Sequence, residues 1–401
     1  MSLNVYYGKS VHGKDEIKAV LEVLKTSTQM GKNVKKFESK INNLFNKKYG
    51  LMVNSGSSAL LLAFEALQLP KNAEVITPVL TFSTSISYII KNNLIPVFVD
   101  VNRETYCIDE DQIKNALSKK TVAIVIPNLL GNLPNLIAIK KIIKKFNKKI
   151  FIIEDSADCL GSKFNKKSTG HYSDISITSF YGSHIINCAG NGGWVGFNDE
   201  KIARKARLLR SWGRTSSIFS DIQESESLKN RFNIDLGGIS YDAKFVFEFP
   251  GYQMEPSEMG AAFGLVQLSN FENVKHKRVM AYKKMEEIFN EFKDFIRLAI
   301  PNPHADVIWM HFPFTIREDA PFSRKELQTF FELRGIQTRP PFSGNILRQP
   351  MIKNQRFLSP DTYENADDLM KNGVLLGCHQ GLSEEQFDHV QDVSHDFFNQ
   401  F

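Results

Sequence analysis

The sequence predicts an α/β protein in which helices sandwich a mixed, mostly parallel sheet and a smaller α+β domain follows. In the first half of the chain, short apolar runs rich in β-branched residues alternate with amphipathic helical patterns. Such alternation is typical of parallel sheets covered on both faces. The 401 residues, 42% of them hydrophobic, suffice for two domains, which we place at 1–265 and 266–401.

The elements of the first half follow from hydrophobic spacing. Apolar residues recur every three or four positions in the segments expected to be helical, namely 16–26, 34–45, 58–67, 111–117 and 136–146. The expected strands are short and almost wholly apolar, and they occupy 49–53, 74–77, 95–99, 122–126 and 150–154.

The second half is less regular. The polar stretch 215–241 shows neither the hydrophobic spacing of a helix nor that of a strand. We interpret it as a long excursion with a role as a lid. From about residue 265 a long helical pattern begins. A strand at 309–316 and a helix at 323–334 then indicate the α+β domain.

Composition excludes several classes of protein. The formal net charge of +6 comes mostly from scattered lysines, and no compact basic and aromatic block indicates nucleic acid binding. No stretch reaches the roughly 18 apolar residues of a membrane helix. The four cysteines form no C-x-x-C pair, so we expect neither a metal site nor a disulfide framework. The polar start fits a cytoplasmic protein.

Three segments carry candidate chemistry. Ser55, Gly56, Ser57 and Ser58 follow a strand and open a helix, where backbone N–H groups favour a phosphate; a plain helix cap explains them equally well. Asp155 and Asp158 follow the C-terminal end of the strand 150–154, where a carboxylate can pair with a protonated pyridine nitrogen or simply cap a helix.

The third segment joins a short strand to a glycine-rich turn. It runs from Ser176 through Ser179 to His184, and Gly190, Asn191, Gly192 and Gly193 follow. An imidazole titrates near neutrality and suits proton transfer, although a lone histidine is more often structural.

Together these segments resemble the DegT/DnrJ/EryC1 family of sugar aminotransferases. Further matching segments lie at 30–38, 250–264, 344–350 and 377–380. The resemblance implies the aspartate aminotransferase-like fold (PLP fold type I). Family aminotransferases carry a lysine, bonded to the cofactor, at the position of His184. A histidine cannot form that bond, so the cofactor, pyridoxal or pyridoxamine 5'-phosphate, is expected to be held non-covalently.

This substitution is similar to the sugar 3-dehydratases of the GDP-4-keto-6-deoxymannose and CDP-4-keto-6-deoxyglucose types. The acid at Asp158 also resembles that branch. The implied reaction is C3 deoxygenation of a nucleotide-linked 4-keto-6-deoxy sugar, giving a 3,6-dideoxy-4-keto sugar for surface polysaccharide biosynthesis. The CDP type uses an iron–sulfur cluster; here no cysteine lies between Cys188 and Cys378, so no such cluster is expected.

The resemblance also implies residue roles. His184 is the expected base, Asp155 the partner of the pyridine nitrogen and Phe82 the ring-stacking residue. Gly56, Ser57, Ser58 and Ser179 are expected at the cofactor phosphate, Asp158 beside the cofactor, and Gln253 at the phosphate of a partner subunit, which implies a homodimer. Weaker candidates for substrate contact are Arg339, Arg348 and His379, each with a structural alternative.

The amino donor and three other functions stay open. Glu255 stands where the family has a basic residue, and an acid there disfavours glutamate as the donor that restores the amino form of the cofactor. The alternatives are an aminotransferase whose lysine lies elsewhere, a catalytically silent relative and a nucleotide-binding scaffold without cofactor. No lysine occurs between Lys167 and Lys201, which counts against the aminotransferase.

Overall fold

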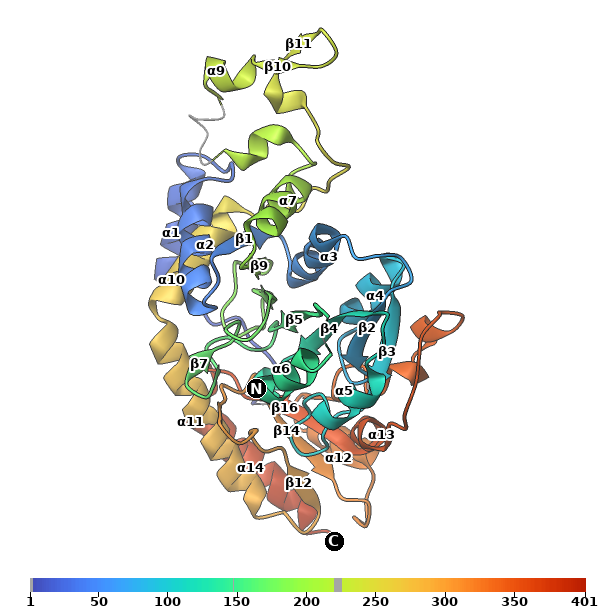
Figure 1. The fold of residues 1–401 in the computed structure, drawn as a ribbon. Coiled ribbons are helices and arrows are strands. Elements are labelled where there is room, and N and C mark those ends of the chain that lie inside the picture. The colour runs from blue at the N-terminus through green and yellow to red at the C-terminus, as the bar shows by residue number, and fades with distance from the viewer. Residues whose placement is uncertain (1–2, 147, 220–225) are drawn as a thin grey trace.

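The computed structural model describes residues 3–146, 148–219 and 226–401. Its centre is a seven-stranded sheet in the order β1-β9-β8-β5-β4-β2-β3 (Figure 1). The strands in that order are Tyr49–Val53, Gly193–Phe197, Ile175–Ser179, Phe151–Asp155, Thr121–Pro127, Glu74–Pro78 and Ile95–Val99. Only β9 runs antiparallel to its neighbours among these seven, so the predicted mixed, mostly parallel sheet is confirmed.

Helices cover both faces of this sheet because its strands are apolar on both sides. Val75 and Val125 face a core shared with α3, whereas the adjacent Ile76 and Ile124 face a second core shared with α5 and α6. The helices around the sheet are α1 Lys14–Leu24, α2 Lys32–Leu44, α3 Gly56–Leu67, α4 Ser83–Lys91, α5 Glu110–Ala116, α6 Leu136–Lys144, α7 Glu200–Arg210 and α10 Glu258–Ser269.

A second, four-stranded antiparallel sheet follows, in the order β12-β14-β16-β15. Its strands are Ile296–Leu298, His311–Ile316, Gly373–Gly377 and Thr338–Arg339. The helices of this region are α11 Phe271–Asn290, α12 Arg324–Leu333, α13 Glu364–Asn372 and α14 Glu384–Phe398. The predicted strand at 309–316 and helix at 323–334 are confirmed to within two residues. The domain boundary after residue 265 falls inside α10 and stays a prediction.

The N-terminal segment returns to this second sheet. Val5 forms a parallel bridge with Ile336, and its backbone exchanges hydrogen bonds with Gly335 and Gln337. Residues just after Val5 are therefore carried to the junction between the two sheets.

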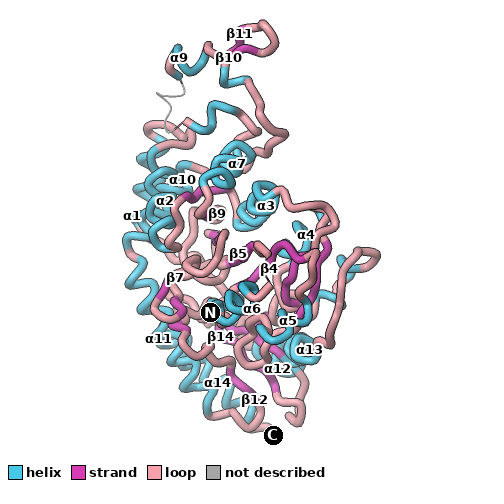
Figure 2. The backbone as a smooth tube through the Cα atoms, in the orientation of Figure 1, coloured by secondary structure: helices cyan, strands magenta, loops and turns pink. Residues whose placement is uncertain are grey.

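The excursion at 215–241 projects from the body of the molecule (Figure 1). Its described residues form short pieces, which are η2 Thr215–Ile218, α9 Leu228–Arg231, β10 Ile234–Asp235 and β11 Ser240–Tyr241. These pieces are all shorter than the helices that cover the sheet (Figure 2). None of the described residues of 215–241 lines the pocket described below, so this part of the excursion forms no lid over the pocket of its own chain.

Candidate active site

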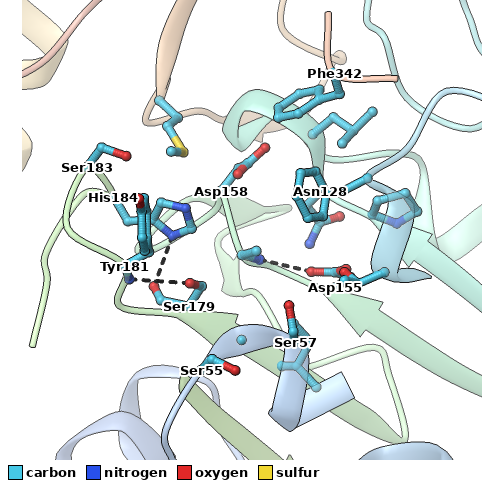
Figure 3. A pocket seen from close by; sticks show the side chains of 18 of the residues that line it. Ser55, Ser57, Asn128, Asp155, Asp158, Ser179, Tyr181, Ser183, His184 and Phe342 are labelled. Carbon is cyan, nitrogen blue, oxygen red and sulfur yellow. Dashed lines mark hydrogen bonds between the residues drawn. The ribbon is translucent and has the colours of Figure 1, made fainter. Parts of the chain in front are cut away.

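The site is a cavity of about 620 Å³ at the carboxyl ends of the parallel strands. Pro127, Asp155 and Ser179 are the last residues of β4, β5 and β8, and all three line it. Because parallel strands end at one edge, residues distant in sequence meet there. Figure 3 shows Asp155 and His184 in the pocket with Ser55 and Ser57 from the start of α3.

The start of helix α3 can bind an anion. Ser55 caps the helix by accepting a hydrogen bond from the Ser58 amide at 3.0 Å, so the helix begins two residues earlier than predicted. A Cβ at Gly56 would lie 2.7 Å from the Cβ of Ser179. This close approach needs glycine and brings the Ser179 hydroxyl beside the helix terminus, whose free N–H groups favour negative charge.

The four residues of this motif do not contribute alike. Ser55, Gly56 and Ser57 line the cavity. Ser58 does not, since its hydroxyl accepts a hydrogen bond from Ser55 at 3.0 Å and belongs to the cap.

Asp155 ends β5 as a buried carboxylate. It accepts hydrogen bonds from the Ala157 amide at 3.1 Å and the Ser85 hydroxyl at 3.2 Å. Burial raises the pKa of Asp155 to about 6, although both hydrogen bonds oppose the shift. A cation placed against this carboxylate would stabilise its charged form, so Asp155 suits a protonated ring nitrogen.

Asp158 lies one turn further and shares the pocket. Its carboxylate accepts a hydrogen bond from the Leu130 amide at 3.2 Å. Burial raises the pKa of Asp158 to about 7, the Leu130 bond opposes the shift, and the charge of Asp155 adds to it. At neutral pH this group can therefore either donate or accept a proton.

His184 points one ring nitrogen at the backbone. Its Nδ1 lies 3.3 Å from the carbonyl oxygen of Ser179, which can only accept, so in the neutral ring Nδ1 carries the hydrogen and Nε2 has the free lone pair. Burial lowers the pKa of His184 to about 4; the Ser179 carbonyl opposes the shift and the buried Arg278 charge adds to it. The imidazole is thus neutral at pH 7 and able to take up a proton.

Two further polar or aromatic side chains reach the cavity from neighbouring elements. Phe82, just before α4, keeps 54% of its surface exposed and lines the pocket, and its stacking on a cofactor ring stays a prediction. Asn128 is 1% exposed, and its amide donates to Glu154 and Ser156 at 2.8 and 2.9 Å. Its Oδ1 is buried without a partner in the described chain, which leaves an acceptor for a bound molecule.

The weaker candidates for substrate contact differ in whether they line the cavity. Arg339 lines the cavity. Its side chain is half-exposed, and a guanidinium nitrogen lies 3.7 Å from a carboxylate oxygen of Glu332. Arg348 forms an exposed, bidentate ion pair with Asp367 outside the cavity. His379 is buried and bonds the Tyr6 carbonyl at 3.2 Å, also outside the cavity lining. The structural alternatives weighed for Arg348 and His379 match these contacts.

Gln253 lies on the surface away from the cavity of its own chain. It is exposed and forms a bridge with Ser211. The predicted contact with a partner's cofactor stays a prediction. Glu255 accepts a hydrogen bond from the Ser211 hydroxyl at 2.6 Å on the same surface.

Of the part of the cavity that the N-terminal segment and the second sheet form, only Arg339 was predicted from the sequence. Tyr7 and His311 line it together with Arg339, and the Tyr7 and His311 rings stack with centroids 3.9 Å apart. We call these three residues the second-sheet wall, and Ser57, Asp155, Asp158, Ser179 and His184 the strand-end wall. No local pattern joins Tyr7 to His311, because the two residues lie far apart in the sequence.

Fold and pocket together define a protein of the aspartate aminotransferase-like class: a seven-stranded sheet with one reversed strand and a phosphate-type helix start beside a strand-end carboxylate. The chain belongs to the DegT/DnrJ/EryC1/StrS aminotransferase family, whose sequence model matches residues 11–394.

The similar proteins within this family include 3-dehydratases. The chain is 33% identical over 393 residues to dTDP-4-dehydro-2,6-dideoxy-D-glucose 3-dehydratase of Saccharopolyspora spinosa, covering 96% of this chain and 84% of that protein. A structure of E. coli GDP-4-keto-6-deoxy-D-mannose-3-dehydratase with hydrated PLP is 30% identical, with a TM-score of 0.86 over 98% of this chain and 100% of that one. Another GDP-4-keto-6-deoxymannose-3-dehydratase structure, with a trapped PLP–glutamate geminal diamine, is 29% identical with the same TM-score, over 97% and 100%.

Other kinds of site find no support among the described residues. They contain no group of three or more His, Cys, Asp or Glu side chains that could hold a metal ion. All four cysteines are buried and unpaired. None of the described helices combines the length and apolar character required to cross a bilayer.

Proposed function

We propose that this protein is a pyridoxal/pyridoxamine phosphate-dependent 3-dehydratase that removes the C3 hydroxyl of a nucleotide-linked 4-keto-6-deoxy sugar. One observation carries the proposal: a neutral histidine, and no lysine, lies in the cavity among the described residues that line it. The named similar dehydratases support the same reaction class.

The residues present fit this cofactor. The start of α3 with Ser57 and Ser179 would hold the phosphate, Asp155 the ring nitrogen, and Phe82 one face of the ring. The unpartnered Oδ1 of Asn128 and the carboxyl group of Asp158 are further polar groups for ring substituents. When bound, pyridoxamine phosphate supplies an amino group for the C4 ketone and a ring that accepts electrons.

The chain's own contribution is proton handling and positioning. Nε2 of His184 can take up one proton at neutral pH and return it to the departing C3 oxygen, because its other nitrogen is fixed at the Ser179 carbonyl. The buried carboxylate of Asp155 would stabilise a positive charge on the ring nitrogen of the bound cofactor, and a protonated ring is the better acceptor of electrons.

The test is a mass-spectrometric screen. The protein is incubated with pyridoxamine phosphate and GDP-, CDP- or dTDP-linked 4-keto-6-deoxy sugars. We expect one of them to lose the mass of one oxygen while ammonia and pyridoxal phosphate appear in equal amounts. Transfer of the amino group to the sugar would instead identify an aminotransferase, and no change in any sugar would indicate a silent relative.

We propose glutamate as the first amino donor to test, because a similar dehydratase structure holds a PLP–glutamate adduct. Glu255 is the residue against it, since its carboxylate would repel that of glutamate. Glutamate-dependent multiple turnovers would support glutamate, and a single turnover per cofactor despite added glutamate would exclude it.

We also propose that the protein acts as a homodimer in the cytoplasm. Leu228, Ile239, Phe245 and Phe247 in and beside the projecting arm each expose more than half of their surface, and clustered exposed apolar side chains are typical of a surface covered in an assembly. Gln253 would then reach the partner's pocket. Light scattering should give twice the 45.6 kDa chain mass; a monomer would exclude the predicted role of Gln253.

A further inference from the structure

The Tyr7 ring is fixed at the edge of the cavity by contacts on several sides. It stacks on His311 with an interplanar angle of 10°, and the Arg339 guanidinium lies 5.5 Å from its ring centroid. Its backbone N–H donates to the Gln337 side chain at 3.1 Å. A ring held in this way presents its hydroxyl in one direction.

The Tyr7 hydroxyl has no hydrogen bond to any part of the chain that the structure describes, although the residue is half-buried and lines the cavity. Burial raises the pKa of Tyr7 well above its usual range, and the nearby Asp158 adds to the rise. The hydroxyl therefore stays protonated and available as a donor. A tyrosine hydroxyl that faces a cavity and has no partner in the described chain is free to donate to an oxygen of a bound ligand.

The position of Tyr7 favours the sugar over the cofactor as that ligand. The groups assigned to the cofactor lie on the strand-end wall, whereas Tyr7 belongs to the N-terminal segment packed on the second sheet. Its neighbours Arg339 and Asp158 are polar, which suits a hydroxylated ring better than an apolar group.

We propose that the Tyr7 hydroxyl donates a hydrogen bond to a hydroxyl oxygen of the sugar, and that Tyr7 is a specificity-determining residue placed by its stack on His311. This inference rests on the proposed 3-dehydratase function. A site built to hydrogen-bond a substrate hydroxyl discriminates against sugars that lack it, because the donor is then left unpaired.

The test compares Tyr7→Phe with Tyr6→Phe. The first variant removes only the hydroxyl and keeps the ring and its stack; the second makes the same change at the adjacent, 43% exposed tyrosine. We measure kcat and KM for the sugar found in the screen, the Kd of that sugar for the protein loaded with pyridoxal phosphate, which lacks the reactive amine, and the Kd of the cofactor.

For Tyr7→Phe we expect a roughly 10-fold loss in kcat/KM and a comparable loss in sugar affinity, the effect of one hydrogen bond. Cofactor affinity should not change, and Tyr6→Phe should match the wild type. Repeating the comparison on the 2-deoxy form of the sugar locates the contact. If the loss disappears there, Tyr7 binds the C2 hydroxyl; if it persists, Tyr7 binds the C3 hydroxyl.

Equal sugar affinity and turnover in Tyr7→Phe and wild type would overturn the inference and leave the proposed function standing. A parallel loss of cofactor affinity would also overturn it, because the hydroxyl would then act on the pocket as a whole. A wild type that deoxygenates none of the sugars would overturn the proposed function and this inference together.

Discussion

The two walls of the cavity are built in different ways. The strand-end wall comes from the start of α3 and from the segments at the ends of β5 and β8, and it contains Asp155, Asp158 and His184, whose pKa shifts all favour the uncharged form of the side chain. The second-sheet wall is assembled from the N-terminal segment, β14 and β15, and it carries the polar tips of Tyr7 and Arg339.

This difference indicates a division of labour. The buried carboxyl and imidazole groups of the strand-end wall need a charged or proton-accepting partner, which a cofactor can provide. The second-sheet wall instead offers fixed hydrogen-bond donors to a ligand that lies between the two walls. Changes in the first wall should therefore affect turnover, stability or cofactor binding, according to the residue that is changed. Changes in the second should affect the sugar alone.

The largest effect is expected at His184. His184→Asn removes the titrating nitrogen and should lower the deoxygenation rate by about 10²–10⁴-fold, the usual contribution of a positioned base. Cofactor affinity should persist, because Asp155, Ser57 and Ser179 are intact. Single-turnover mass spectrometry measures the rate and fluorescence titration the affinity.

The matched control for this change is His276→Asn, at an exposed position on α11. It should leave both quantities unchanged. If His184→Asn kept its turnover, His184 would not be the base. The proposed separation of roles between the two walls would then be wrong as well.

The next effect is on stability and depends on pH. The pKa of Asp158 is raised by burial from 3.8 to about 7, so its ionisation destabilises the cofactor-free fold as the pH rises from about 4 to 7. Asp158→Asn should therefore stabilise the cofactor-free protein at pH 8, by about 2–4 kcal/mol, and the gain should vanish near pH 4. Denaturant unfolding at the two pH values measures it.

Asp319→Asn, an exposed carboxylate beyond β14, provides the control and should have little effect at either pH. A gain for Asp158→Asn that is the same at pH 4 and pH 8 would mean that packing rather than charge causes it.

Asp155 tests cofactor binding on the same wall. Asp155→Asn keeps the shape but removes the charge that would face the ring nitrogen, and it should weaken cofactor affinity by about 10–100-fold, as for a hydrogen bond to a charged group. Binding is followed by the change in cofactor fluorescence. An affinity equal to that of wild type would show that no charged nitrogen faces Asp155.

The sequence predicted the strand-end wall because its signals are local. Ser55–Gly56, Asp155 and Ser179–His184 each follow a recognisable strand, and parallel strands bring their ends together. The start of α3 at Gly56 was predicted two residues late, since serine and glycine fill its first positions and a sequence fixes a helix end only to within one or two residues. The stack of Tyr7 on His311 depends on the packing of the N-terminal segment against β14, which no periodicity in the sequence predicts.

Tertiary packing also explains why the two arginines that were equal candidates for substrate contact differ in position. Arg339 and Arg348 both follow the second sheet's helix α12 in sequence, but only Arg339 lines the cavity, while Asp367 from α13 engages Arg348. The sequence contains both residues of that ion pair without indicating that they meet.

These arginines give the smallest expected effect and the last test of the comparison. Arg339→Ala should raise the KM for the sugar nucleotide by about 10-fold with kcat and cofactor affinity retained, because a charge-assisted contact on the second-sheet wall is lost. Arg348→Ala should leave KM unchanged and cost at most about 1 kcal/mol of stability, as expected for an exposed ion pair. Steady-state kinetics on both variants measure KM and kcat, and unfolding measurements give the change in stability. A loss of cofactor affinity in Arg339→Ala, or a raised KM in Arg348→Ala, would show that the sugar and the cofactor are not divided between the walls in this way.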